Sequence, residues 1–341
     1  LAVLTLSGCG GGGGGGTTSP ATSTTISGVA AAGAPIIGFA YLKDSQNNEL
    51  GPVTIASDGT FSFDLTKLPT GSTGPYYLQA QGAAGGQNFV LHSVTANAGT
   101  ANINPLTDVV VAQATGAVPA TAFANTKAIT TVTQTSIDAA IAAMQKTLQP
   151  LLNAADATLA TVNPITVSYV ADPTKNKLDA LFDAVSINVS SASGAASVSV
   201  TDKSGASVIP ATSVGSTPAS STTTSIQQTI TDAQAITSFL SDFATTVNAK
   251  GSALTTADVD KYYYGNDSSF GLQNGYTRTQ TIQDFVASIA GKEMLQIHGQ
   301  ITKASNFAIV LDVTANNTYQ NQFNKVYRIR VDFNFQDGSY G

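Results

Sequence analysis

Short segments of alternating apolar and polar residues limit the folds available to the first third of the chain. Phe61, Phe63 and Leu65 occupy alternate positions, which is the period of a half-buried strand. Turn signals separate this segment from other strand-like segments, at residues 24–31, 35–44, 76–82 and 88–96. Several short strands at this spacing predict an antiparallel β-sandwich over residues 25–105.

The middle of the chain combines helical spacing with one hairpin pattern. An apolar face beginning at Leu106 predicts one helix. A second helix begins near Thr135, which lies at capping-box spacing from Asp138, and Pro150 should kink or end it. The residues on either side of Gly194 alternate as in two paired strands. Residues 106–203 are therefore expected to form a helical segment followed by a β-hairpin.

The last part of the chain is expected to be a separate α+β domain. Residues 204–224 are rich in Ser, Thr, Gly and Pro, which predicts a linker. Of 25 Phe and Tyr residues, 13 lie at or after Tyr262, which indicates a second core. Two helical patterns, at 225–250 and 278–290, precede three strand-like runs, at 294–304, 307–315 and 325–336. Residues 225–341 thus predict helices against a curved antiparallel sheet, forming a cone-like domain.

Two segments resemble known domain families. Residues 26–44 followed by 57–65 resemble the carboxypeptidase regulatory-like (transthyretin-like) sandwich, whose members are usually non-catalytic spacers or adhesive domains. Residues 271–285 resemble the helix that leads into the sheet of the nuclear-transport-factor-2-like cone. That second resemblance implies a pocket between the helices and the concave face of the sheet.

The first residues indicate where the protein is located. Leu6-Ser7-Gly8-Cys9 resembles the lipobox of bacterial lipoproteins, in which the chain is cut before the Cys and the Cys is acylated. Residues 1–8 are then the remnant of a signal peptide. Seven consecutive glycines follow Cys9, and residues 9–24 are expected to form a lipid-bearing tether with a reach of roughly 20 Å. The resemblance implies a membrane partner, outer-membrane anchoring, and a periplasmic or cell-surface location.

Composition excludes several function classes. Charged residues make up 11% of the chain and the net charge is −6, which argues against nucleic-acid binding. The two histidines, His92 and His298, lie in different expected domains, and no group of His and Cys residues has the spacing of zinc ligands. Carboxylates between Asp44 and Asp64 could surround a calcium ion, but they lack EF-hand order and are expected to face water. No metal, cofactor or catalytic residue is therefore predicted.

One group of residues forms a candidate ligand pocket in the cone-like domain. It consists of Tyr262, Tyr263, Tyr264, Asp267 and His298. In such cones an Asp or His can act as a base while a Tyr stabilises an enolate. The tyrosines fit a packing role equally well. The favoured function is a lipid-anchored envelope protein with a structural, adhesive or binding role, toward an envelope protein or a carbohydrate. The alternatives are a small-molecule-binding cone and an isomerase-like or dehydratase-like enzyme.

Overall fold

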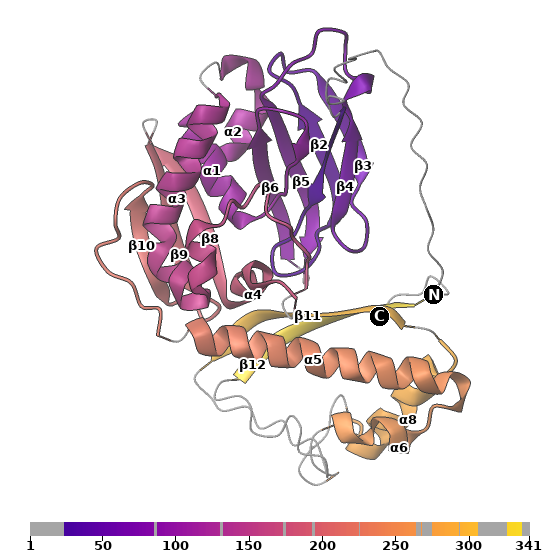
Figure 1. Ribbon diagram of the computed structural model, residues 1–341. Coiled ribbons are helices and arrows are strands. Elements are labelled where there is room, and N and C mark those ends of the chain that lie inside the picture. The colour runs from indigo at the N-terminus through magenta and orange to yellow at the C-terminus, as the bar shows by residue number, and fades with distance from the viewer. Residues whose placement is uncertain are drawn as a thin grey trace, which may run out of the picture.

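The N-terminal part of the chain contains sheets that are antiparallel except for one short parallel pair, and several helices and further strands follow (Figure 1). A computed structural model describes residues 24–84, 87–129, 132–172, 175–192, 195–224, 226–263, 267, 275–292, 294–305 and 326–335. Cys9 and the glycine run lie outside the described residues. No helix in the described ranges is long and apolar enough to cross a membrane.

The first strands form two sheets. They are β1 (Thr25–Val29), β2 (Ile37–Lys43), β3 (Glu49–Thr54), β4 (Thr60–Asp64), β5 (Tyr76–Ala84), β6 (Gln87–Thr95) and β7 (Gly99–Thr100). One sheet has the order β3-β2-β5-β6 and the other β4-β1-β7. The five predicted strands are confirmed. Sequence patterns missed β3, which contains Pro52, and β7, which has two residues.

Four helices follow these sheets. They are α1 (Pro105–Thr115), α2 (Pro119–Ala124), α3 (Gln134–Ala155) and α4 (Lys177–Ala184). The N-cap of α3 is Thr133, whose Oγ1 accepts a hydrogen bond from Ser136 N at 3.2 Å, so the predicted cap was two residues too late. Pro150 does not end α3. The apolar face of α3 is buried on both sides of Pro150, and this packing offsets the hydrogen bond that proline removes.

A third sheet contains the predicted hairpin and one unpredicted strand. Strands β8 (Val185–Ala192) and β9 (Ala195–Asp202) pair as expected. Strand β10 (Ser207–Ser213) pairs with β9 and lies inside the segment expected to be a linker. Val208 and Ile209 explain this correction, because both are buried in the main core. Two apolar residues thus anchor a segment whose polar composition is typical of a linker.

The predicted boundary near residue 105 does not separate two cores. A single buried apolar cluster extends from Ile26 to Ile230 and includes residues of the three sheets formed by β1–β10 and of α1, α3 and α4. Helix α5 (Ile226–Lys250) begins on this cluster. Its later residues Phe243 and Val247 belong to a second cluster. One long helix therefore joins the two buried clusters (Figure 1).

The helices that follow α5 contribute to the second cluster, except for the first of them. They are η4 (Gly251–Ala253), α6 (Thr256–Val259), η5 (Asp260–Tyr262) and α8 (Arg278–Ile289). The chain then forms β11 (Met294–Ser305), which pairs antiparallel with β12 (Val326–Phe335) beside α5 (Figure 1). Both helices and two of the three strands expected here are present. The third expected strand, at 307–315, lies outside the described residues.

Candidate functional site

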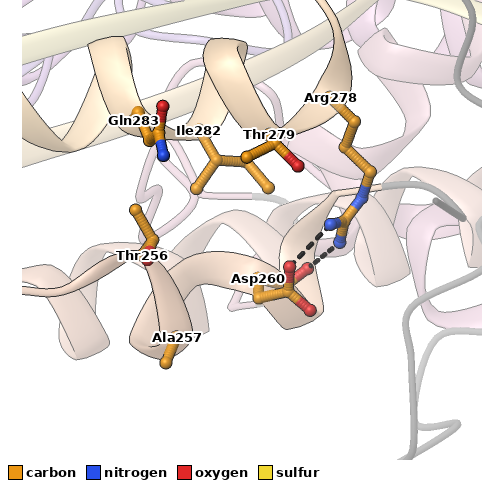
Figure 2. Close-up of a pocket in the computed structure, with 7 residues that line it drawn as sticks. All are labelled: Thr256, Ala257, Asp260, Arg278, Thr279, Ile282 and Gln283. Carbon is orange, nitrogen blue, oxygen red and sulfur yellow. Dashed lines mark hydrogen bonds and ion pairs between the residues drawn. The ribbon is translucent and has the colours of Figure 1, made fainter. Parts of the chain in front are cut away.

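A cavity of about 350 Å³ lies between α6 and α8. Figure 2 shows residues of the two elements facing each other across it. The lining residues are Thr256, Ala257, Asp260, Arg278, Thr279, Ile282 and Gln283. Hydroxyl, amide and charged groups therefore surround a small apolar floor at Ile282, an arrangement suited to a small polar molecule.

Arg278 determines the electrostatics of this cavity. Its side chain is only 8% exposed, and Nη1 lies 2.6 Å from Asp260 Oδ1. Nη2 donates to the carbonyl oxygens of Asp260 at 2.7 Å and Tyr263 at 3.2 Å. The guanidinium thus ties η5 to the first turn of α8 (Figure 2). Its charge is met by Asp260, so a ligand anion would have to compete with a carboxylate already in place.

Asp267 supports the same turn of α8 from outside the cavity. Its Oδ1 accepts a hydrogen bond from Thr279 N at 2.8 Å, and its Oδ2 accepts one from Thr279 Oγ1 at 3.0 Å. A carboxylate at a helix N-terminus satisfies a free N–H group and interacts favourably with the helix dipole. The arrangement places Asp267 in a positioning role for α8.

Tyr262 packs in the second core. Its ring makes edge contacts with Phe239 and Phe243, with centroids 5.5 and 5.1 Å apart. Its hydroxyl donates to Asp242 Oδ2 at 2.7 Å and lies 2.6 Å from Thr246 Oγ1. Burial is the main cause that raises the pKa of Tyr262. These contacts fix Tyr262 against α5, and it does not line the cavity.

The remaining members of the expected pocket are not all brought together. The Tyr263 ring packs on Phe285 with centroids 6.2 Å apart, and burial raises the pKa of Tyr263 to about 12. His298 lies on β11, opposite Asp332 of β12, and its side chain is outside the described part of the structure. Tyr264 also lies outside the described residues. The cavity instead uses Asp260 and Arg278, whose pairing the sequence analysis did not predict.

Two buried carboxylates on α4 form a second polar cluster that the sequence analysis missed. Asp179 and Asp183 are 0% and 1% exposed, and they lie one turn apart on the helix. Tyr169 Oη donates a hydrogen bond to Asp179 Oδ1. Neither oxygen of Asp183 has a hydrogen-bond partner within the described residues. Burial raises the pKa of Asp179 to about 7 and that of Asp183 well above its ordinary value.

His92 joins β6 to α1. Its Nδ1 lies 3.0 Å from Asp108 Oδ1, and its Nε2 lies 3.0 Å from Gln79 Nε2. The ring is 6.0 Å from the ring of Phe123, and His92 is 3% exposed. Burial raises the pKa of Asp108, and the contact with His92 opposes that effect. His92 thus has satisfied polar contacts at a packed junction.

The loop carboxylates considered for calcium make local turns. Asp44 Oδ1 accepts from Gln46 N and Asn48 N at 2.8 Å. Asp58 and Asp64 accept hydrogen bonds in the same way from the residue two positions later. Such bonds are typical of Asx turns. No group of three metal-binding side chains occurs in the ranges that the structure describes.

No protein-family model, curated protein or solved structure matches this chain.

Proposed function

We propose that the chain is a lipid-anchored protein of the cell envelope, delivered to the outer membrane and displayed on the tether of residues 9–24. The Leu6-Ser7-Gly8-Cys9 sequence carries this proposal, and the start of the folded body is compatible with it. The tether leads directly into β1, which pairs with β4 from Thr25 onward and buries Ile26 completely in the main core. A Gly-, Ser- and Thr-rich sequence of this kind is typical of a linker, and the strand that follows it is central in its sheet, so the folded body would be held clear of the lipid surface.

The folded body has a structural, adhesive or binding role. The shared core of residues 26–230 supports this role, because it makes the sheets and helices one platform. Residues 25–105 are proposed to be the carboxypeptidase regulatory-like sandwich, with the β3-β2-β5-β6 and β4-β1-β7 sheets as its layers. Residues 225–341 are proposed to be the nuclear-transport-factor-2-like cone, with α5 lying along the β11-β12 pair.

The anchor is tested with the complete export signal in a Gram-negative host. The wild-type chain should partition into detergent and Cys9→Ser should stay in the aqueous phase, because each buried methylene contributes about 0.8 kcal/mol. Ser7→Ala is the matched control and should behave as the wild type, since it keeps a small residue before the Cys. Equal partitioning of wild type and Cys9→Ser would show that Cys9 carries no anchor.

The binding role is tested on the lipid-free Cys9→Ser chain. It should co-sediment with purified envelope fragments without detergent if it has a partner there. Protease treatment of the fragments should remove the binding when the partner is a protein and should leave it when the partner is a carbohydrate. A chain that stays in the supernatant with every preparation would contradict the binding role.

A second candidate function is small-molecule binding in the C-terminal part, with isomerase-like or dehydratase-like chemistry as its enzymatic form. The cavity between α6 and α8 favours it. Ala257 is exposed and lines this cavity, whereas Ala253 is exposed and does not. A compound that binds in this cavity should raise the melting temperature of the wild type and of Ala253→Phe. It should leave the melting temperature of Ala257→Phe unchanged. The same result with both variants would assign the ligand to another site.

A further inference from the structure

Strand β6 forms one edge of the four-stranded sheet, and α1 covers only one end of that edge. On one side β6 pairs with β5 along its length, and no other described strand pairs with it. At His92 the outer edge is occupied. His92 N donates to Asp108 Oδ1 at 2.6 Å, and His92 O accepts from Thr107 Oγ1 at 2.6 Å. Both partners belong to α1, so no further strand can pair with β6 at this position.

The outer edge is open over residues 87–91. Main-chain groups alternate sides along a strand, so Asn88 and Val90 present their N–H and C=O groups on the same side as His92. No hydrogen bond to these outward groups occurs within the described residues. Asn88 is exposed, and Val90 is 47% exposed. Two donors and two acceptors of the main chain are therefore available to an added strand.

This segment lacks the features that protect other edges of the fold. Strand β3 has Glu49, Pro52 and a register shift in its pairing with β2. Strand β10 has Pro210 and two register shifts in its pairing with β9. Charges, prolines and bulges are the usual means by which proteins prevent strand addition. Residues 87–91 contain neither a charge nor a proline and are paired without a shift.

The exposed face beside this edge is uncharged and includes large apolar side chains. Register places Phe39, Gln81 and Val90 side by side across β2, β5 and β6. Phe39 is 48% exposed and Ile37, two residues earlier on the same face, is 54% exposed. A strand added to β6 would place one of its side chains roughly 5 Å from Val90. An apolar or β-branched side chain fits that place, and a charged side chain does not.

The length of the free edge decides between two possible occupants. A second copy of the chain pairing through β6 would share only the short segment between His92 and the β5–β6 turn. Stable dimers bury about 1,200–2,000 Å², which is more than one strand pair of this length provides. An extended peptide needs only the main-chain bonds and one or two side-chain contacts.

We propose that residues 87–91 of β6 are a strand-addition site for an extended, uncharged, apolar segment of a partner protein. Assignment of this site depends on the proposed binding role and specifies the class of partner. It does not depend on the lipid anchor. The open edge provides the affinity through the main chain of Asn88 and Val90. The side chain of Val90 selects an apolar neighbour.

The first test is hydrogen exchange, measured by NMR on the full chain. The probe is a capped pentapeptide of alternating threonine and valine, and its control carries N-methyl groups on the valines. The amides of Asn88 and Val90 should exchange fast in the free chain and at least tenfold more slowly with the probe. The amides of Phe89 and Leu91 point toward β5 and should not change. The N-methylated peptide should have no effect.

The second test uses variants and the binding of the same peptide carrying a fluorescent label. Val90→Pro removes an outward N–H without breaking a bond to β5, and Val90→Lys adds a charge at the edge. Both should weaken binding at least tenfold. Phe39→Ser is the matched control, because it removes similar apolar exposure from the same face and leaves the edge intact. Circular dichroism confirms that each variant is folded.

Three results would overturn the site. Binding that is lost with Phe39→Ser and kept with Val90→Pro would indicate docking on the face of the sheet. Concentration-dependent protection of Asn88 and Val90 without peptide would assign the edge to a second copy. At about 1 mM peptide, a binding free energy of about −4 kcal/mol would be detected. If the amides of Asn88 and Val90 are not protected at that concentration, the edge binds no strand. If envelope co-sedimentation persists in that last case, the binding role stands and its site lies elsewhere.

Discussion

We expect the stability of the protein to depend on pH through the buried carboxylates of α4. Asp179 and Asp183 are fully buried and lie one turn apart, and Tyr169 donates to Asp179. Lys203 opposes the rise in the pKa of Asp183, and Asp172 adds to the rise in the pKa of Asp179. Burial disfavours the charged form of each carboxyl. The native state therefore keeps protons that the unfolded chain releases.

The sign and size of this effect follow from the pKa of Asp179. Burial raises it from 3.8 to about 7. Since the native state binds the proton more tightly, stability is greatest at low pH and falls as pH rises from the unfolded pKa through the native pKa. Between about pH 5 and about pH 8, Asp179 alone should lower the free energy of unfolding by about 3 kcal/mol. Asp183, whose pKa is also raised, should deepen the loss.

The double variant Asp179→Asn/Asp183→Asn should remove this dependence, because amides do not ionise. Urea unfolding followed by far-UV circular dichroism gives the free energy of unfolding at each pH. The wild type should lose about 3 kcal/mol or more between about pH 5 and about pH 8, and the double variant less than about 1 kcal/mol. Asp138→Asn, at an exposed position on α3, is the matched control and should keep the wild-type slope. A wild-type chain equally stable at both pH values would refute the reasoning.

Three further substitutions test the packing and the helix caps, each by urea unfolding against the wild type. Phe243→Ala should cost about 3–5 kcal/mol, because Phe243 is 6% exposed and its ring lies 5.1 Å from that of Tyr262; a loss below about 1 kcal/mol would mean that the second cluster is not a packed core. Thr133→Ala should cost about 1 kcal/mol by removing the N-cap of α3, whereas Thr133→Ser should cost much less. Asn104→Ala should cost about 2–4 kcal/mol, because Asn104 caps α1 and also donates to Pro164 O at 3.1 Å. Equal losses for Asn104→Ala and Asn104→Ser, which keeps a capping oxygen, would contradict the capping role.

The cavity shows the limit of sequence reasoning about the candidate site. A second buried cluster is present, but among the aromatic residues from Tyr262 onward only Tyr262, Tyr263 and Phe285 are described as packing against it. Which polar groups meet was not predictable, since Asp260 and Arg278 are separated by many residues and share no motif. The Tyr262 hydroxyl instead bonds to Asp242 and Thr246 of α5, and Tyr262 does not line the cavity. Pairing of distant polar groups depends on how the helices dock.

Local periodicity by itself determined many of the elements. Alternation at Phe61 and Phe63 predicted β4. The spacing of apolar residues predicted α1, α3, α5 and α8, with bounds close to those observed. These patterns work because strand and helix side chains repeat at two and 3.6 residues. Tertiary structure overrode local signals where burial was strong enough. Helix α3 continues through Pro150 because its apolar face is packed in the core. Strand β10 lies in the third sheet because Val208 and Ile209 are buried there.

Helix α4 shows most clearly what only the tertiary structure decided. Its sequence reads as a short amphipathic helix, with Asp179 and Asp183 on what would be its solvent side. In the folded chain every residue from Leu178 to Ala184 is buried, because α5 and β8 pack against the helix as well as the main core. A sequence pattern reports which face of a helix prefers the core. It does not report whether a second element, distant in sequence, will cover the other face.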